Sequence, residues 1–267
     1  ADKILDFIRK SAPHLEYLMI TGGEPFIDTT HAEALKLLKP YAKNIVLEYT
    51  TNLNTLTKNG VNVLELWDDF KQVRLKVSID GDPDIYNYVR YGGNIEALMA
   101  NAKKVYERFP IENKEPYKFF PSEKVVIVGT CTVSIYNIAR LDKIANFITG
   151  LGAIFHTSQV NYPPFQSSQV LPAESKRKIS ENLYKFIDDV EGNLQWGDSL
   201  LWQTPEAREI QKPRVYRFIK NSIHHMNGAD KYDALYQRFL DFEKQFNQHK
   251  DVPPEGFQRF LADSHLI

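Results

Sequence analysis

The chain has 267 residues, of which 43% are hydrophobic and 25% are charged, a composition typical of a globular protein with one large domain or a domain and an appendix. It has 33 Lys and Arg residues and 34 Asp and Glu residues, which gives a net charge of -1. Because the sequence also has no dense run of basic residues, we expect no nucleic-acid partner. No apolar segment approaches the roughly 20 residues that span a bilayer, and the first residues lack a signal-peptide pattern, so we expect no membrane partner. The single cysteine, Cys131, excludes an intramolecular disulfide and fits a reducing compartment, which favours a cytoplasmic protein.

Strands and helices are predicted to alternate over the first 160 residues. Hydrophobic spacing and turn signals predict helices at residues 2–10, 30–39, 61–70, 94–109 and 137–147, and strands at residues 17–20, 44–50, 73–79, 124–133 and 153–157. Thr30 and Glu33 have the spacing of a capping box for the second helix, and Asn137 is expected to cap the fifth. Residues 110–122 read as a loop. This alternation implies parallel strands with crossover helices, in an open α/β sheet or a barrel.

The composition changes after residue 160. Residues 161–172 form an irregular segment with three prolines, and only helical patterns follow, at residues 179–190, 206–224, 232–246 and 255–262. Trp196 and Trp202 fall in the connections, where tryptophan usually anchors packing. We therefore expect an α/β domain over residues 1–172 and a helical C-terminal extension over residues 173–267.

Small and polar residues follow four of the predicted strands, at positions 22–24, 51–52, 78–80 and 132–134. The carboxyl ends of parallel strands meet on one side of a sheet, where ligands bind. Gly22 and Gly23 can take φ > 0 and let a ligand approach the backbone, and the Glu24 carboxylate can accept hydrogen bonds from an ammonium group. The alternative is that Glu24 only caps the helix that follows. The convergence predicts a ligand site without identifying the ligand.

Four motifs occur in order: TGGEP after the first strand, TTN after the second, SIDG after the third, and then YVRYGG. In this order they resemble radical S-adenosylmethionine proteins, over roughly residues 15–172, and the chain looks most similar to the twitch-domain-containing subgroup. The resemblance implies a partial (β/α) barrel. It also implies that Gly22, Gly23 and Glu24 bind the amino group of S-adenosylmethionine.

The same resemblance implies roles for four further residues. Ser78 and Arg90 match positions that hold the carboxylate of S-adenosylmethionine, a task that suits a bidentate guanidinium. Asn52 and Asp80 match positions on the ribose or substrate side. Taken without the resemblance, Arg90 reads as a surface ion-pair residue and Asp80 as an ordinary turn residue before Gly81.

The chain departs from the family pattern in one respect. The family carries CxxxCxxC after its first strand, and the three thiolates hold a [4Fe–4S] cluster. Cys131 instead lies within a predicted apolar strand, where a buried structural thiol is the simplest interpretation. We therefore expect a fragment that lacks the first strand of the barrel and is inactive alone.

The resemblance also implies the activity of an intact parent, an oxidoreductase that binds iron and sulfur. It would cleave S-adenosylmethionine reductively at the cluster, with electrons from a reductase, and abstract hydrogen from an unidentified substrate, with a peptide as one candidate. One alternative is a non-catalytic, degenerate module that binds a peptide, a metabolite or a protein partner. Another is a different barrel enzyme, but no metal-ligand spacing or phosphate loop supports it. His224 and His225 are adjacent in a predicted helix and point apart, which argues against a metal pair.

Overall fold

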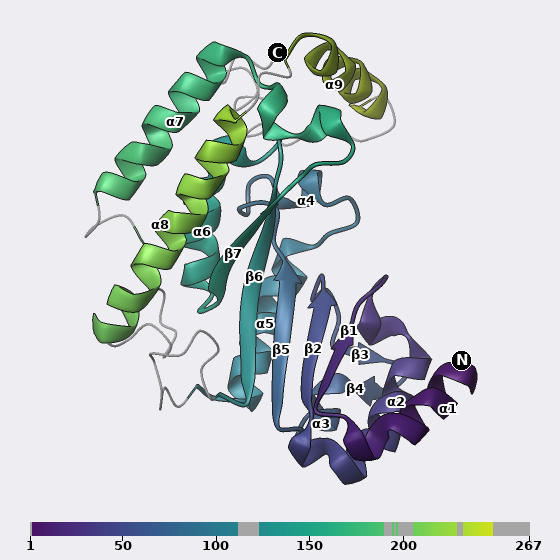
Figure 1. Ribbon diagram of the computed structural model, residues 1–267. Coiled ribbons are helices and arrows are strands. Elements are labelled where there is room, and N and C mark those ends of the chain that lie inside the picture. Colours follow the sequence, from purple (N-terminus) through teal and green to yellow (C-terminus); the bar gives the residue numbers. More distant parts are fainter. Residues whose placement is uncertain are drawn as a thin grey trace.

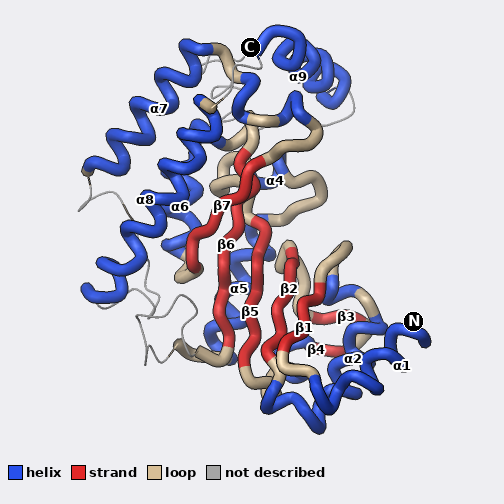
Figure 2. Tube along the Cα trace, viewed as in Figure 1, coloured by secondary structure: helices blue, strands red, loops and turns tan. Residues whose placement is uncertain are grey.

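The computed structural model describes residues 2–111, 123–189, 194, 196, 205–228 and 232–247. In this part of the chain, five strands form one sheet (Figures 1 and 2): β1 (Tyr17–Ile20), β2 (Val46–Thr51), β5 (Gln72–Ser78), β6 (Val125–Val133) and β7 (Ile154–Gln159). Their order is β1-β2-β5-β6-β7, and every pairing is parallel, so the predicted parallel α/β sheet is confirmed. The spatial order of these five strands is the same as their order along the chain. This sheet therefore has no point at which the strand order reverses, unlike the sheet of a doubly wound fold.

Helices connect the strands and extend the chain beyond β7. The α-helices are α1 (Asp2–Ser11), α2 (Thr29–Leu38), α3 (Val63–Leu66), α4 (Tyr86–Val89), α5 (Ile95–Arg108), α6 (Leu141–Gly150), α7 (Ala173–Asp188), α8 (Pro205–Asn227) and α9 (Tyr232–Asn247). The described residues also form six short 3-10 helices: η1 (Ala12–His14), η2 (Pro25–Ile27), η3 (Lys39–Asn44), η4 (Ile138–Arg140), η5 (Pro164–Gln166) and η6 (Ser168–Val170).

The two faces of β5 differ in polarity. On β5, Val73, Leu75 and Val77 are buried, whereas the alternate residues Arg74 and Lys76 are only half-buried. The apolar face packs on α2, α5 and α6 in one large core, and Figure 1 shows α5 behind the sheet. This alternation is the period-two pattern of a strand with one apolar face. On the polar face of β5, Arg74 and Lys76 are in register with Val126 and Val128 of β6, which are buried in a second apolar cluster with Ile154 and with Ala207 of α8.

Three local predictions are wrong. The N-cap of α2 is Asp28, whose carboxylate accepts a hydrogen bond from the Thr30 N–H, so Thr30 lies inside the helix. The helix predicted at residues 61–70 begins instead as a hairpin, β3 (Thr57–Lys58) with β4 (Val61–Asn62), and only α3 follows. The hairpin forms because Asn59 and Gly60 both take positive φ, of 50° and 77°, as a tight two-residue turn requires. The third is the capping role of Asn137, described with the site below.

The helices after β7 pack on the sheet domain. α8 lies along β7, α7 packs on α8, and α9 contacts η5 and η6 (Figure 1). Trp196 is half-buried against the core, as expected of an anchoring tryptophan. The helix predicted at residues 255–262, Trp202 and most of the predicted loop at 110–122 lie outside the described residues. In the described part of the chain, no helix has the length and apolar character needed to cross a membrane.

Candidate functional site

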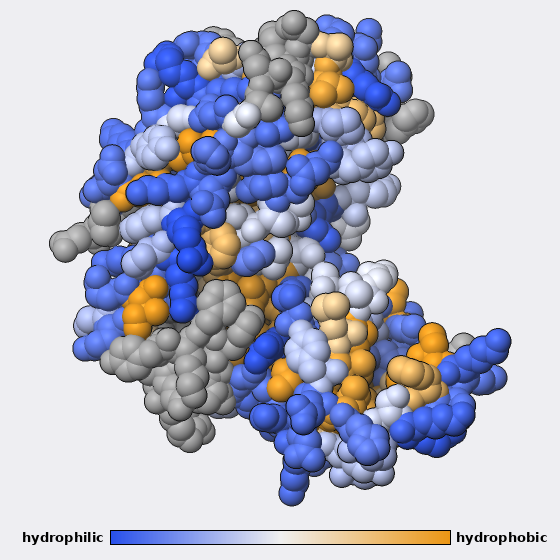
Figure 3. Space-filling model, viewed as in Figure 1, coloured by the Kyte–Doolittle hydropathy of each residue, from blue (hydrophilic) through white to orange (hydrophobic). Residues whose placement is uncertain are grey.

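Side chains from the carboxyl ends of four strands meet at one end of the sheet. In Figure 3 the surface is hollowed between the part formed by α4 and the part formed by β1 and α2. The predicted site residues come from the last residue of β5 and from the segments that follow β1, β2 and β5. The expected convergence of these segments is therefore present.

Glu24 joins the end of β1 to the end of β2. Its Oε1 accepts a hydrogen bond from Thr51 Oγ1 at 2.6 Å, and its Oε2 accepts one from the Asn52 N–H at 2.8 Å. Oε1 also accepts from the Phe26 N–H at 3.4 Å, so Glu24 caps η2 as the simpler interpretation predicts. The carboxylate is half-buried and fixed in position, while its four lone-pair sites leave room for a further donor.

Gly22 and Gly23 leave open space beside Glu24. Gly22 takes φ of 130°, a conformation that L side chains rarely adopt. Both glycines are exposed, and a Cβ built on either would meet no atom within 4 Å. A ligand can therefore approach this stretch of backbone closely.

A second charged group lies at the ends of β5 and β6. Asp80 Oδ2 accepts from Arg90 Nη1 at 2.5 Å, and Asp80 Oδ1 accepts from the Thr132 N–H at 2.6 Å. The Arg90 side chain keeps 29% of its area exposed. A guanidinium has five N–H donors, so the ion pair leaves donors of Arg90 for a ligand.

Ser78 ends β5 on the polar face, in register with Thr130. Within the described residues it makes no hydrogen bond to Asp80 or Arg90. The structure therefore brings together Glu24 with Asn52, and Asp80 with Arg90, and leaves Ser78 as a separate half-buried hydroxyl.

Tyr86, in α4, is fully buried. Burial raises the pKa of its phenol, Arg90 opposes that rise, and Asp80 and Glu24 add to it. Glu24 and the Asp80–Arg90 pair lie at the same end of the sheet, because they follow the carboxyl ends of strands that pair in parallel.

Asn137 supports the second group, although the sequence predicted only a helix cap. Its side-chain amide does not cap η4. Instead Nδ2 donates to the backbone carbonyls of Asp80 at 2.9 Å and Thr132 at 3.0 Å, and Oδ1 accepts from the Ser134 N–H at 2.8 Å. Asn137 is fully buried and ties the end of β5 to the turn after β6.

The turn that leads from β5 to Arg90 is fixed by residues that sequence reasoning missed. Arg140 donates Nε to Asp82 Oδ2 at 2.6 Å and Nη2 to Asp82 Oδ1 at 2.9 Å, and it also pairs with Asp84. Gly81 permits the close turn, because a Cβ there would lie 2.7 Å from the Tyr86 Cα. The only local signal was the Asp82-Pro-Asp84 spacing, since the Asp84 N–H donates to Asp82 Oδ1 as in an Asx turn.

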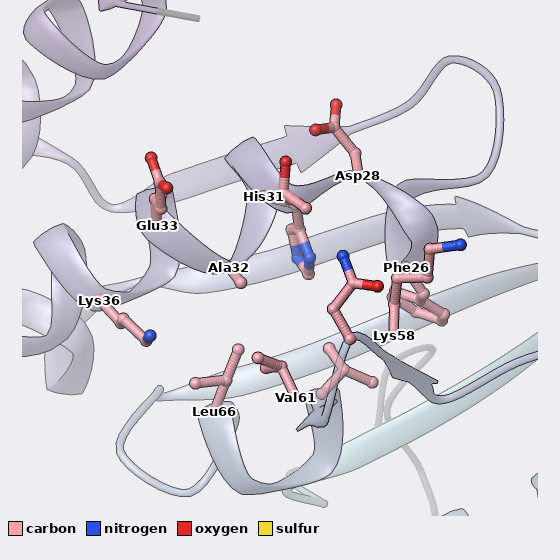
Figure 4. A pocket seen from close by; sticks show the side chains of 12 residues that line it. Phe26, Asp28, His31, Ala32, Glu33, Lys36, Lys58, Val61 and Leu66 are labelled. Atoms are coloured by element: carbon pink, nitrogen blue, oxygen red, sulfur yellow. The ribbon is translucent and has the colours of Figure 1, made fainter.

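A cavity of about 170 Å³ lies elsewhere, between α2 and the β3–β4 hairpin (Figure 4). His31 is in its wall, and Phe26, Val61 and Leu66 supply apolar lining. Burial lowers the pKa of His31 to about 4, which keeps the imidazole neutral beside the Tyr49 hydroxyl, 2.9 Å from Nε2. None of the seven predicted site residues lines this cavity.

The chain does not supply the ligands of an iron–sulfur cluster. Its single cysteine, Cys131, is fully buried in β6, and burial raises the pKa of the thiol, both as expected of a structural residue. The described residues also contain no group of three or more His, Cys, Asp or Glu side chains placed to hold a metal ion. A [4Fe–4S] cluster therefore does not fit the residues of this chain.

Comparison with known proteins gives a limited result. No protein-family model matches the chain, and no curated protein matches its sequence. Among solved structures it is similar to Streptococcus suis SuiB bound to S-adenosylmethionine, with 16% identity and a TM-score of 0.47 over 73% of this chain and 40% of SuiB. For SuiB without that ligand, the identity is 16% and the TM-score 0.46, over 73% of this chain and 42% of SuiB. For SuiB bound to precursor peptide SuiA, the identity is 15% and the TM-score 0.46, over 73% of this chain and 40% of SuiB. The chain thus spans well under half the length of SuiB, and similarity at this level does not establish a shared function.

Proposed function

We propose that the chain is the S-adenosylmethionine-binding part of a radical S-adenosylmethionine enzyme, and that the cluster-binding cysteines of the enzyme lie upstream of residue 1. The observation that carries the proposal is the placement of Glu24 beside an open glycine backbone, at the same carboxyl end of the parallel sheet as the Asp80–Arg90 pair. An α-amino acid group needs both an anionic acceptor and a cationic donor. These strand ends provide both.

In this proposal the residues bind and orient the methionine part of the cofactor. The Gly22 and Gly23 carbonyls and the remaining lone pairs of Glu24 accept from its ammonium group. The N–H groups of Arg90 that are not bonded to Asp80 bind its carboxylate, with Ser78 as a further donor. Bound S-adenosylmethionine supplies the sulfonium chemistry, while Thr51 and Asn52 hold the Glu24 carboxylate in place.

The exposed edge of the sheet supports an additional upstream strand, as in a barrel that lacks its first strand. β1 is an edge strand among the described residues, and Tyr17 and Met19 on it are 45% and 54% exposed. On α1, Ile4 and Phe7 are 59% and 70% exposed. An exposed apolar edge strand is a ready template for pairing. We infer that an upstream strand pairs with β1 in the complete protein.

The polar face of the sheet is the proposed substrate side. Lys76 on β5 forms an ion pair with the buried Glu48 carboxylate on β2 at 2.5 Å. His156 on β7 packs edge-on against Phe218 of α8, with ring centroids 4.9 Å apart. Burial lowers the pKa of its imidazole, and the charge of Lys76 adds to that shift. The Lys76–Glu48 ion pair suits a polar substrate with charged groups, and a peptide is one such candidate.

The second candidate function is a non-catalytic binding module. It is favoured by one observation: Glu24 and Arg90 already have partners within the protein, so both can be purely structural. The gene sequence upstream of residue 1 separates the two candidates. A CxxxCxxC within roughly 60 codons, the space for one strand and its loop, favours the enzyme, whereas a start codon at this point favours the module.

The proposal is tested by S-adenosylmethionine binding to the full-length protein after anaerobic reconstitution with iron and sulfide. Arg90→Ala should weaken binding by about 1.5–3 kcal/mol, the scale of hydrogen bonds to charged groups. Arg108→Ala is the matched control, because Arg108 pairs with Asp68 at the same 2.5 Å but its side chain is 48% exposed. Calorimetry that gives the same affinity for wild type and Arg90→Ala would contradict the assignment of Arg90.

A further inference from the structure

The carboxylate of Glu243 on α9 is buried, although Glu243 is far from the predicted site residues in the sequence. Glu243 is 6% exposed; its Oε1 accepts from the Tyr136 hydroxyl at 2.6 Å and its Oε2 accepts from the Tyr88 hydroxyl. A buried carboxylate is costly unless hydrogen bonds compensate for its lost hydration. Apolar contacts also hold α9. Phe239 packs edge-on against Tyr136, and the ring centroids of Phe242 and Phe165 are 5.3 Å apart. Anchoring of α9 therefore does not by itself require a buried charge.

The two tyrosines belong to the two segments that place the Asp80–Arg90 pair. Tyr88 lies in α4, two residues before Arg90, and Tyr136 immediately precedes Asn137, which donates to the Asp80 carbonyl. The Tyr88 and Tyr136 rings also contact each other, with centroids 6.4 Å apart. Figure 1 shows α9 at the same end of the molecule as α4. One carboxylate thus bridges the segments on either side of the ion pair.

We propose that Glu243 is a positioning residue for the cofactor site: it holds Tyr88 and Tyr136 and so fixes the Arg90 guanidinium against Asp80. The inference rests on the proposed function, because it assigns Glu243 to the same site. Burial raises the pKa of the Tyr136 hydroxyl, and the neighbouring Glu243 carboxylate raises it further. The hydroxyl therefore keeps its proton and remains a donor to the carboxylate.

Thermodynamic linkage makes this coupling reciprocal. If Glu243 improves the binding of S-adenosylmethionine through Arg90, then bound S-adenosylmethionine must stabilise the contact of α9 with Tyr88 and Tyr136 by the same factor. A helix that only covers the sheet has no such dependence. The exchange of α9 backbone amides with solvent therefore reports the coupling.

The test uses the full-length protein reconstituted with iron and sulfide. Glu243→Gln keeps the size of the side chain but removes the charge and turns an NH₂ group toward one of the tyrosines. We expect the Kd for S-adenosylmethionine to rise about tenfold, within the usual range of coupling between sites. The double variant Tyr88→Phe/Tyr136→Phe should change the Kd in the same direction. In the wild type, S-adenosylmethionine should slow amide exchange in α9, and in Glu243→Gln this protection should be lost.

Phe242→Leu is the matched control, because it loosens α9 against Phe165 without touching the carboxylate. It should lower Tm and leave the Kd unchanged. An equal Kd for wild type and Glu243→Gln, or an equal rise in Kd for Phe242→Leu, would overturn the positioning role. A wild-type protein that does not bind S-adenosylmethionine at all would instead overturn the proposed function, so the two failures are distinguishable.

Discussion

Asp80→Asn is the substitution that most directly measures how firmly Arg90 is held. The asparagine carbonyl can still accept from the Thr132 N–H, but the amide NH₂ then faces Arg90, so one charge-assisted hydrogen bond is lost. Such a bond contributes about 1.5–3 kcal/mol. Because the Arg90 side chain is 29% exposed and water can replace part of the contact, we expect the free energy of unfolding to fall by about 2 kcal/mol. For a chain of this size that corresponds to a Tm lower by about 4–8 °C.

Urea denaturation of the 267-residue chain measures this change, with Asp68→Asn as the control. Asp68 and Arg108 are also separated by 2.5 Å, but their side chains are 42% and 48% exposed, and exposed pairs contribute about 0.2–1 kcal/mol. The Asp80 variant should therefore lose clearly more stability than the control. Equal losses would refute the conclusion that burial makes the Asp80–Arg90 pair a fixed part of the site.

Two further predictions concern the packing around the sheet. Gly129→Ala on β6 should destabilise the fold by about 1–3 kcal/mol, because its Cβ would lie 2.5 Å from Ile148 Cγ2. Gly150→Ala is the control: a Cβ there meets open space, so its stability should change by less than about 1 kcal/mol. Equal losses of stability for the two variants would contradict the close contact at Gly129. Burial lowers the pKa of His31 from 6.5 to about 4. As the pH falls, His31 therefore binds a proton in the unfolded chain before it does so in the folded protein. Up to about 3 kcal/mol of folding stability should be lost between pH 6.5 and 4. An NMR titration should place the His31 midpoint near the lower value, and a midpoint near 6.5 would contradict its contact with Tyr49 inside the fold.

The sheet was predictable because its signals are regular and local. The alternation of Arg74 and Lys76 with Val73, Leu75 and Val77 identifies a strand with one apolar face. Repeated strand–helix alternation then requires parallel pairing. The parallel pairing holds for all five strands of this sheet in the described part of the chain.

The β3–β4 hairpin was missed although its signal was present. Asn59-Gly60 is a strong marker of a tight hairpin turn, but the apolar residues that follow it from Val63 to Trp67 have helical spacing and dominated the prediction. Strands of two residues are too short for the alternation of side chains to show. The turn residues should have decided the assignment.

The supports of the candidate site could not be predicted in the same way. Thr51 reaches Glu24 across 27 positions of the chain, Asn137 reaches Asp80 across 57, and Glu243 reaches Tyr88 across 155. No local pattern encodes contacts between segments so far apart. These partners are visible only once the strands have brought the segments together.

The measurement that tests the account most directly compares two ligands by calorimetry on the full-length protein after reconstitution with iron and sulfide. S-adenosylmethionine carries the amino acid group that Glu24 and Arg90 are proposed to hold, and S-methyl-5′-thioadenosine lacks it. We expect S-adenosylmethionine to bind more than about tenfold tighter, since each charged hydrogen bond contributes about 1.5–3 kcal/mol, and Glu24→Gln to reduce that difference. Equal affinities for the two ligands, or a difference that Glu24→Gln leaves unchanged, would contradict the assignment of this site.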